Sequence, residues 1–190
     1  ARSLSSKPLP RTAIKPTVKA PASESKLSRS APVSRQSAQI PPRELTKMIT
    51  AQSSWEDLLS LHEKERQSFN ETHLTAAMNK LTKLCKRADQ KLQLKQDNRF
   101  KRLQENVGKA VPVFREQAVA NSIHALASLA VDNNPLLFAL CNRAKHAHIS
   151  RQLSPQGCAN IIWSLTTLSH RDELLKLLIE RFETNSDETT

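Results

Sequence analysis

The chain has 190 residues, a formal net charge of +11, only 4% aromatic residues and only two glycines. This length is sufficient for one domain with a hydrophobic core, whereas two glycines cannot form a glycine-rich phosphate-binding loop. No segment approaches the run of about 18 uncharged apolar residues that a membrane span requires, so we expect no membrane partner.

Residues 1–43 have the composition of an extended, disordered-type basic arm. They contain seven of the ten prolines, nine serines and nine Lys or Arg residues against one acid, Glu24. Such a segment buries too little surface to offset the entropy of ordering it, so we expect a polyanion to hold it. The same composition is typical of an organellar transit peptide, which is the alternative interpretation. If the segment is an arm held by a polyanion, we expect it to bind RNA through Arg2, Lys7, Arg11, Lys15 and Lys19.

Apolar periodicity and a scarcity of breakers predict an all-α domain over residues 44–183, followed by a polar tail at 184–190. Ser53 or Ser54 is the expected N-cap of the second helix, and Gly108 the expected stop of the fourth. Pro135 and Pro155 are expected in the first turns of later helices. The helices predicted in chain order are 42–51 (or 43–51), 54–66, 71–86, 90–107, 114–131, 135–146, 155–169 and 171–182.

One sequence motif occurs twice in the C-terminal half of the chain. Residues 117–129 align without a gap to residues 156–168, 39 positions later, and six of the thirteen residues are identical. A weaker copy at 72–84 lies 45 residues before the first of these two copies. The longer interval implies an insertion in the lysine-rich stretch between them. A period of about 40 residues is typical of stacked helical repeats. We therefore predict a short α-solenoid of about three helix-turn-helix repeats with a disordered-type basic N-terminal arm.

The second copy resembles the signature helix of octotricopeptide repeats, and it reads Gln156-Gly157-Cys158-Ala159-Asn160-Ile161-Ile162-Trp163-Ser164-Leu165-Thr166-Thr167-Leu168. Helical repeats of RAP-domain and FASTK-type proteins are similar. The first copy matches the signature at Gln117, Ala120, Asn121, Ile123, Leu126 and Leu129. The resemblance implies an organellar RNA-binding protein, in the mitochondrial matrix or alternatively in the chloroplast. Some members of the family are subunits of mitochondrial ribosomes, and others act in RNA maturation, stability or translation.

A second basic region covers residues 80–109, with ten Lys or Arg residues against three acids. Part of it repeats a base every three or four residues, so an uninterrupted helix would present one basic ridge. Such a ridge would bind phosphates, and the alternative is a solvated face without a partner. A break near Gln90 would divide the ridge between two helices. The RNA-binding candidates here are Lys80, Lys83, Lys86, Arg87, Lys91, Lys95, Arg99, Lys101 and Arg102.

Asn121 and Asn160 occupy equivalent positions in the two clear copies. Their amides are candidates for reading base edges, as amides do in other helical RNA-binding repeats. The alternative is a structural role, in which each amide bonds a backbone carbonyl between helices, and this is the interpretation that we favour. His124 and Trp163, also equivalent to one another, are expected to pack between repeats and not to serve as stacking platforms.

The sequence offers no arrangement that is typical of an enzyme or of a cofactor site. Cys141, His146 and His148 lack the further ligands and the spacing of a zinc site, so we expect no metal. We find no paired carboxylates in an apolar setting and no Ser-His-Asp or Cys-His spacing, so we expect no catalytic residue, no cofactor and no small-molecule substrate.

These observations favour an RNA-binding structural component of a mitochondrial ribosome, whose partners are ribosomal RNA and neighbouring ribosomal proteins. The first alternative is a dissociable organellar factor for RNA maturation, stability or translation. The second is a protein-protein scaffold, in which the basic arm serves only import.

Overall fold

The computed structural model describes residues 40–132, 135–170 and 173–187, with side chains described as far as residue 180. The chain divides into two units, and every described residue belongs to the second, Ala38–Thr190. The described residues form helices without any strand, which confirms the predicted all-α class. Of the predicted arm, only residues 40–43 are described, and α1 already begins within them.

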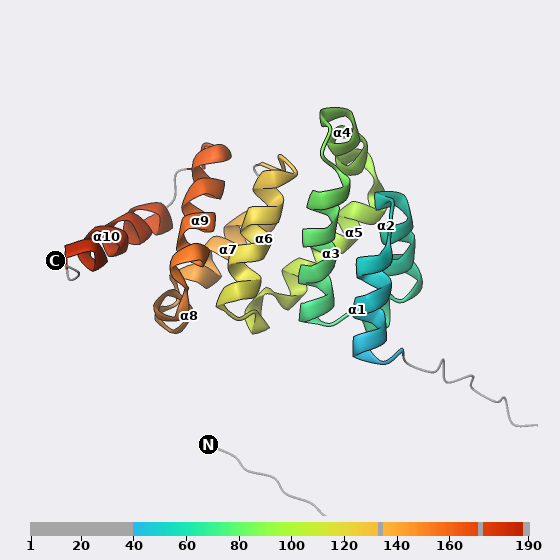
Figure 1. Ribbon diagram of the computed structural model, residues 1–190, viewed down its shortest axis with the longest axis horizontal. Helices are drawn as coiled ribbons and strands as arrows, with labels where there is room; N and C mark the ends of the chain where they lie inside the picture. Colours follow the sequence, from blue (N-terminus) through green and yellow to red (C-terminus); the bar gives the residue numbers. More distant parts are fainter. Residues whose placement is uncertain (1–39, 133–134, 171–172, 188–190) are drawn as a thin grey trace, which may run out of the picture. The chain divides into compact units, whose positions relative to one another are not determined.

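Ten α-helices and two short 3-10 helices follow one another along the described part of the chain (Figure 1). They are α1 (Pro42–Ala51), α2 (Trp55–Lys64), η1 (Arg66–Ser68), α3 (Glu71–Leu84), α4 (Ala88–Gln96), α5 (Asn98–Ala110), η2 (Val111–Val113), α6 (Glu116–Ser128), α7 (Pro135–Lys145), α8 (Ala147–Gln152), α9 (Pro155–Thr167) and α10 (Glu173–Asp187).

Side-chain caps account for where several helices begin. Ser54 is the N-cap of α2, and its hydroxyl accepts a hydrogen bond from the Asp57 N–H at 3.1 Å. Ser154 caps α9 in the same way, accepting from the Gly157 N–H at 3.1 Å, and Pro155 fills the first helical position. In both cases the hydroxyl satisfies an amide that the helix itself leaves unpaired. These two helix starts confirm the predictions.

Two predictions in the lysine-rich stretch are wrong. The helix expected over 90–107 is two helices, α4 and α5, which separate at Asp97. The Asp97 carboxylate accepts a hydrogen bond from the Arg99 N–H at 2.7 Å, so it caps the second helix where a continuous helix was expected. Gly108 does not end a helix, because α5 continues to Ala110. The structure also adds α8, whose six residues are too few to show a period.

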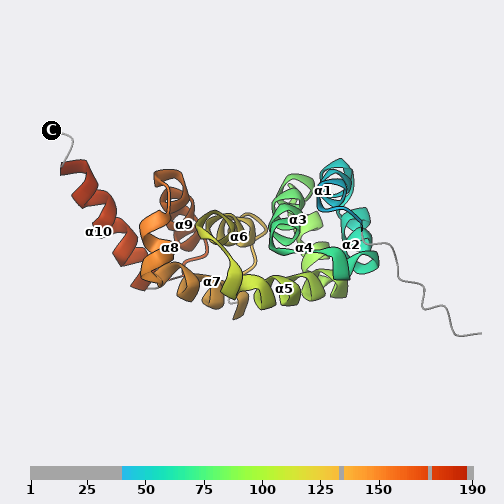
Figure 2. The same ribbon diagram turned by 90° about the horizontal axis from the view of Figure 1, so that it is seen from below.

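The described helices pack in two layers. In one layer α1 contacts α3, α3 contacts α6 and α6 contacts α9. In the other, α2 contacts α5 and α5 contacts α7, and contacts between α3 and α5 and between α6 and α7 join the layers. Figure 2 shows α3, α6 and α9 on one side and α5 and α7 on the other. Each of α3, α6 and α9 therefore has one face toward the core and one face away from α5 and α7.

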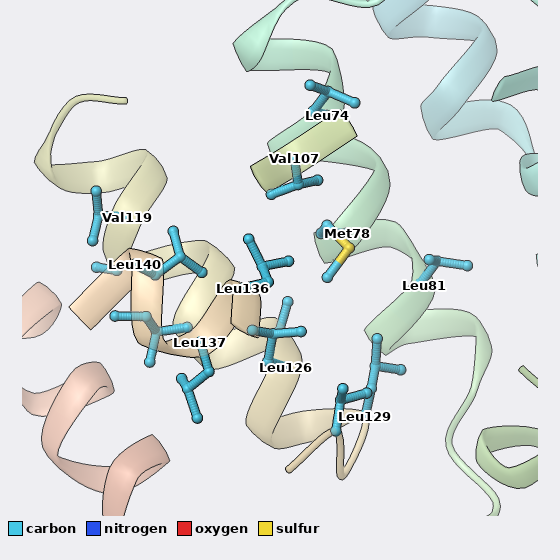
Figure 3. Packing of buried hydrophobic residues seen from close by; sticks show 14 of the residues in the cluster. Leu74, Met78, Leu81, Val107, Val119, Leu126, Leu129, Leu136, Leu137 and Leu140 are labelled. Carbon is cyan, nitrogen blue, oxygen red and sulfur yellow. The ribbon is translucent and has the colours of Figure 1, made fainter. Parts of the chain in front are cut away.

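Aliphatic side chains fill the space between the two layers (Figure 3). Met78 of α3, Leu126 of α6 and Leu136 of α7 are at most 5% exposed and belong to one cluster. Burying a side chain of this size stabilises a fold by about 1.5–3 kcal/mol, so such contacts are a major source of cohesion. The three cysteines are buried, and none of them forms a disulfide with another described residue.

The repeated motif forms the same structure twice. α6 and α9 have thirteen residues each, and two residues after each helix comes a residue with a positive φ, 55° at Ala130 and 51° at Ser169. At the C-terminal end of α6 the Val131 N–H donates to the Leu126 carbonyl at 2.9 Å, and at that of α9 the His170 N–H donates to the Leu165 carbonyl at 2.8 Å. This pattern is a helix terminus closed by a left-handed residue. The 39-residue period of the sequence is thus also a period of the backbone, at these two helices.

Candidate nucleic-acid interface

The predicted RNA-binding residues fall into several groups in the structure. Arg2, Lys7, Arg11, Lys15 and Lys19 lie outside the described residues. The expected ridge is divided, because α3 ends at Leu84 and α4 begins at Ala88, with Arg87 as its N-cap. The regular spacing of bases in this stretch therefore does not place them on one helix face.

Five of the predicted residues have partners within the protein. The Lys80 ammonium donates to the Thr50 carbonyl at 2.6 Å, and the Lys95 ammonium donates to the Ala130 carbonyl at 3.2 Å. The remaining three are arginines in carboxylate pairs: Arg87 with Asp89 at 2.6 Å, Arg99 with Asp97 at 2.7 Å and Arg102 with Glu63 at 2.9 Å. These arginine charges are largely neutralised locally, so they contribute less to an attraction for phosphate.

The carboxylates of these pairs titrate at lower pH than usual. The hydrogen bond from Arg102 lowers the pKa of Glu63, and the hydrogen bond from Arg99 lowers the pKa of Asp97. Arg99 also donates to the Ser60 hydroxyl at 2.9 Å, so its side chain joins α5 to α2. The two arginines thus act mainly as connections between helices of the same domain.

Lys83, Lys86 and Lys91 lack an acidic partner among the described residues. Lys83 and Lys86 are exposed and Lys91 is half-buried, at the end of α3, the following turn and the start of α4. Residues 83–96 contain five bases, these three with Arg87 and Lys95, against one acid, Asp89. We call these five bases the basic corner. A concentration of exposed positive charge at one end of a helix pair is an electrostatic footprint for a polyanion.

Two further lysines of α5 lie away from the basic corner. Lys101 lines a groove of about 420 Å³ between α5 and α7, together with Pro135 and Leu136. Lys109 lines a different groove of about 620 Å³, together with Arg66 and Phe69. The structure therefore brings together only part of the charge that the sequence concentrates in residues 80–109.

We call the face of α6 and α9 that points away from α5 and α7 the open face. Asn121 and Asn160 lie on it, where both line one groove of about 380 Å³. Asn121 also lines a groove of about 520 Å³ between α3 and α6. Both side chains are half-buried, and neither amide has a hydrogen bond to another of the described residues. The backbone-bonded role that the sequence favours for these amides is thus not seen in the described part of the chain.

Trp163 and His124 contact one another across α9 and α6, with ring centroids 5.2 Å apart and an interplanar angle of 36°. The contact between repeats agrees with the prediction, but Trp163 is not a packing residue in the ordinary sense, because it is 49% exposed. The repeat alignment contains the signal that was missed. The Asn and the aromatic residue, His124 or Trp163, are four and seven places after the Gln that opens each copy, which puts all three on one helix face.

Reactive side chains among the described residues include the buried thiol of Cys85. Burial raises the pKa of the Cys85 thiol to about 11, which keeps it protonated and unreactive at neutral pH. In the part of the chain that the structure describes, no group of three or more His, Cys, Asp or Glu residues is arranged to hold a metal ion.

Among the described helices, none combines the length and the apolar content that a bilayer crossing requires.

Comparison of the whole chain with protein-family models and with curated proteins found no match. The proposed function of this domain is therefore based on its own residues and geometry.

Proposed function

We propose that this protein is an RNA-binding helical-repeat protein, built as a short α-solenoid of about three repeats, that serves as a structural component of a mitochondrial ribosome. The observation that carries the proposal is the basic corner, where Lys83, Lys86 and Lys91 are left without acidic partners among the described residues. The chloroplast remains the alternative compartment.

The basic corner supports RNA over a protein partner. Lysines without carboxylate partners bind phosphates with release of counterions, which gives affinity without a requirement for sequence. The basic composition of residues 1–43 adds eight net positive charges, nine bases minus one acid, to the same molecule. A protein-protein scaffold has no need for either region.

The repeat architecture is supported by the matching ends of α6 and α9 and by the contact of α3 with α6. A stack of about three repeats offers few positions at which bases are read in sequence, in contrast to long helical-repeat factors. This favours a stabilising role on ribosomal RNA over selection of one transcript. The resemblance of residues 156–168 to octotricopeptide repeats is the basis for the organellar setting.

The proposal is tested with the tagged full chain expressed in its own cells. Organellar lysate is sedimented on a sucrose gradient, and RNA crosslinked to the protein is sequenced. We expect co-sedimentation with a ribosomal subunit and recovery of ribosomal RNA fragments. Recovery of one messenger RNA in the soluble fractions would instead indicate a dissociable factor. A protein that sediments alone and crosslinks to no RNA would overturn the RNA-binding function itself.

A further inference from the structure

We propose that His124 and Trp163 form a stacking platform for an unpaired RNA base on the open face of α6 and α9. We call these two side chains the aromatic pair. This inference rests on the proposed RNA-binding function and specifies the form of RNA that this face accepts, namely single-stranded RNA.

The exposure of the aromatic pair is the first observation. Trp163 is 49% exposed although it lies on a helix that packs against both α6 and α10, and its ring is 5.2 Å from that of His124. Leaving half of an indole in water forgoes stabilisation that burial would supply. The two rings are tilted by 36° to one another, and the exposed part of Trp163 is accessible from solvent. A flat aromatic ligand can cover such a surface without any rearrangement of the helices.

The neighbours of the aromatic pair supply hydrogen-bonding groups. Asn121 and Asn160 lie three residues before the two aromatic residues, and Gln117 and Gln156 lie four residues earlier again. The four amides line one groove of about 380 Å³ and have no hydrogen bonds to other described residues. Amides with free donors and acceptors are suited to base edges, which present both. Glu116 in the same lining disfavours a phosphate, so the groove fits bases better than the sugar-phosphate chain.

The phosphates have a separate binding surface, the basic corner, at the end of α3 and along α4. In the alignment of the copies, Lys83 of α3 is equivalent to Ser128 of α6 and Thr167 of α9, so it continues the line of the amides and aromatics. Lys95, of the same basic corner, bonds the Ala130 carbonyl directly behind α6. The amide groove lies at the N-terminal ends of α6 and α9, and Lys95 bonds Ala130 beyond the C-terminal end of α6, so the aromatic pair lies between the groove and the basic corner along the helices. Proteins bind single strands by combining lysines for the phosphates with aromatic side chains for the bases.

A paired strand does not fit this face. Bases in an A-form duplex are stacked on one another, so their flat surfaces are covered, and their major-groove edges lie too deep for side chains. Aromatic side chains stack on bases only where these are unpaired. The aromatic pair therefore predicts a preference for single-stranded over double-stranded RNA that charge alone would not produce.

The test compares Trp163→Ala with Phe138→Ala in the full chain. Phe138 is a matched control, because it is an aromatic residue with 59% exposure on α7, in the other layer. The probes are a single-stranded adenine homopolymer and an RNA duplex of the same length. For Trp163→Ala we expect about a tenfold loss of single-strand affinity and no change in duplex affinity, since stacking contributes to single strands alone. Trp163→Phe should recover part of the loss, and Phe138→Ala should change neither affinity.

A fluorescence measurement provides a readout that does not depend on a destabilising variant. Trp55 is 9% exposed, so in Trp55→Phe protein the remaining emission comes from the exposed Trp163. Stacking on a base should quench that emission on addition of the homopolymer but not of the duplex. Equal single-strand affinities for Trp163→Ala and wild type, or unquenched emission at saturation, would overturn the stacking site while leaving the RNA-binding function in place. Failure of the wild-type chain to bind either probe would overturn both.

Discussion

His62 is the residue whose protonation state the structure defines most closely. Its side chain is fully buried, with Nε2 3.0 Å from the Asn106 side-chain nitrogen and the ring edge-on to Phe69. Arg66 donates to the Asn106 oxygen, so the amide nitrogen must face the ring, and Nε2 must accept. The ring proton is then on Nδ1, which is 4.0 Å from a Glu63 oxygen. A second proton on Nε2 would place two donors face to face.

The fold is therefore predicted to lose stability in mild acid because of His62. Burial lowers its pKa from 6.5 to about 4, and the nearby guanidinium groups of Arg66 and Arg102 act in the same direction, against Glu63. The unfolded chain takes up this proton near pH 6.5, and the folded chain only near pH 4. Stability from His62 is thus complete above pH 6.5 and falls between these values, by roughly 2 kcal/mol from about pH 7 to about pH 5.

Urea unfolding at several pH values measures this effect, with His62→Gln as the comparison. Glutamine offers an acceptor to Asn106 but does not titrate, so the variant should show less than half of the wild-type loss over this range. Glu63 and Asp97 have pKa values below their ordinary 4.5 and 3.8, so their contributions are lost only at lower pH. A His62→Gln variant with the same pH dependence as wild type would show that His62 is not the responsible group.

At the scale of elements, two positions have a backbone conformation that another residue type would adopt at lower free energy than the residue present. Gly108 lies inside α5, where an added Cβ would meet only Leu136 Cδ1 at 3.9 Å. Ala130 has a φ of 55°, a left-handed conformation that favours glycine. Opposite substitutions at these two positions should therefore both stabilise the domain.

We predict that Gly108→Ala and Ala130→Gly each raise the free energy of unfolding by about 0.5–1 kcal/mol. Gly157→Ala is the control, because its Cβ would lie 3.3 Å from Ser154 Oγ and 3.4 Å from Leu153 Cδ2, which offsets the gain in helix propensity. Thermal unfolding followed by circular dichroism gives the comparison. A lower midpoint for either of the first two variants would contradict the assigned backbone conformations.

The elements that could be predicted are those whose signals are local. Ser54, Ser154 and Pro155 mark helix starts within a few residues, and the apolar spacing identifies the helix faces. The break at Asp97 was missed because it depends on Arg99, which Ser60 of α2 also holds. Asp97 and Asn98 are residues favoured at N-caps, but Lys95, Gln96 and Arg99 around them are good helix formers, so the predicted helix was drawn through the break.

The candidate site was harder to predict, because partners distant in sequence decide which charges are free. Arg102 is paired with Glu63, 39 residues away, and Lys80 with the Thr50 carbonyl, 30 residues away. Local spacing contains no information on either contact. The exposure of Trp163 likewise depends on how closely α6 and α9 approach, which the helical period does not define.

At the scale of the whole molecule, the proposed RNA interface consists of two separate surfaces, one for phosphates and one for bases. We propose that the basic corner, at the end of α3 and along α4, binds phosphates without regard to sequence, and that the aromatic pair and the amides of α6 and α9 bind bases. The pair of Arg102 with Glu63 connects two other helices, α5 and α2. RNA binding should therefore depend on salt through a few identifiable lysines.

The most direct test is the salt dependence of binding to single-stranded RNA between about 50 and 200 mM salt. We compare wild type with a triple change of Lys83, Lys86 and Lys91 to glutamine. The control removes the same charge by changing Lys47, Lys64 and Lys176, which are exposed but lie beside carboxylates. We predict that the slope of log affinity against log salt becomes shallower by about 2 in the first triple variant and stays unchanged in the control. Equal slopes in all three proteins, or a wild-type slope near zero, would contradict the proposed interface.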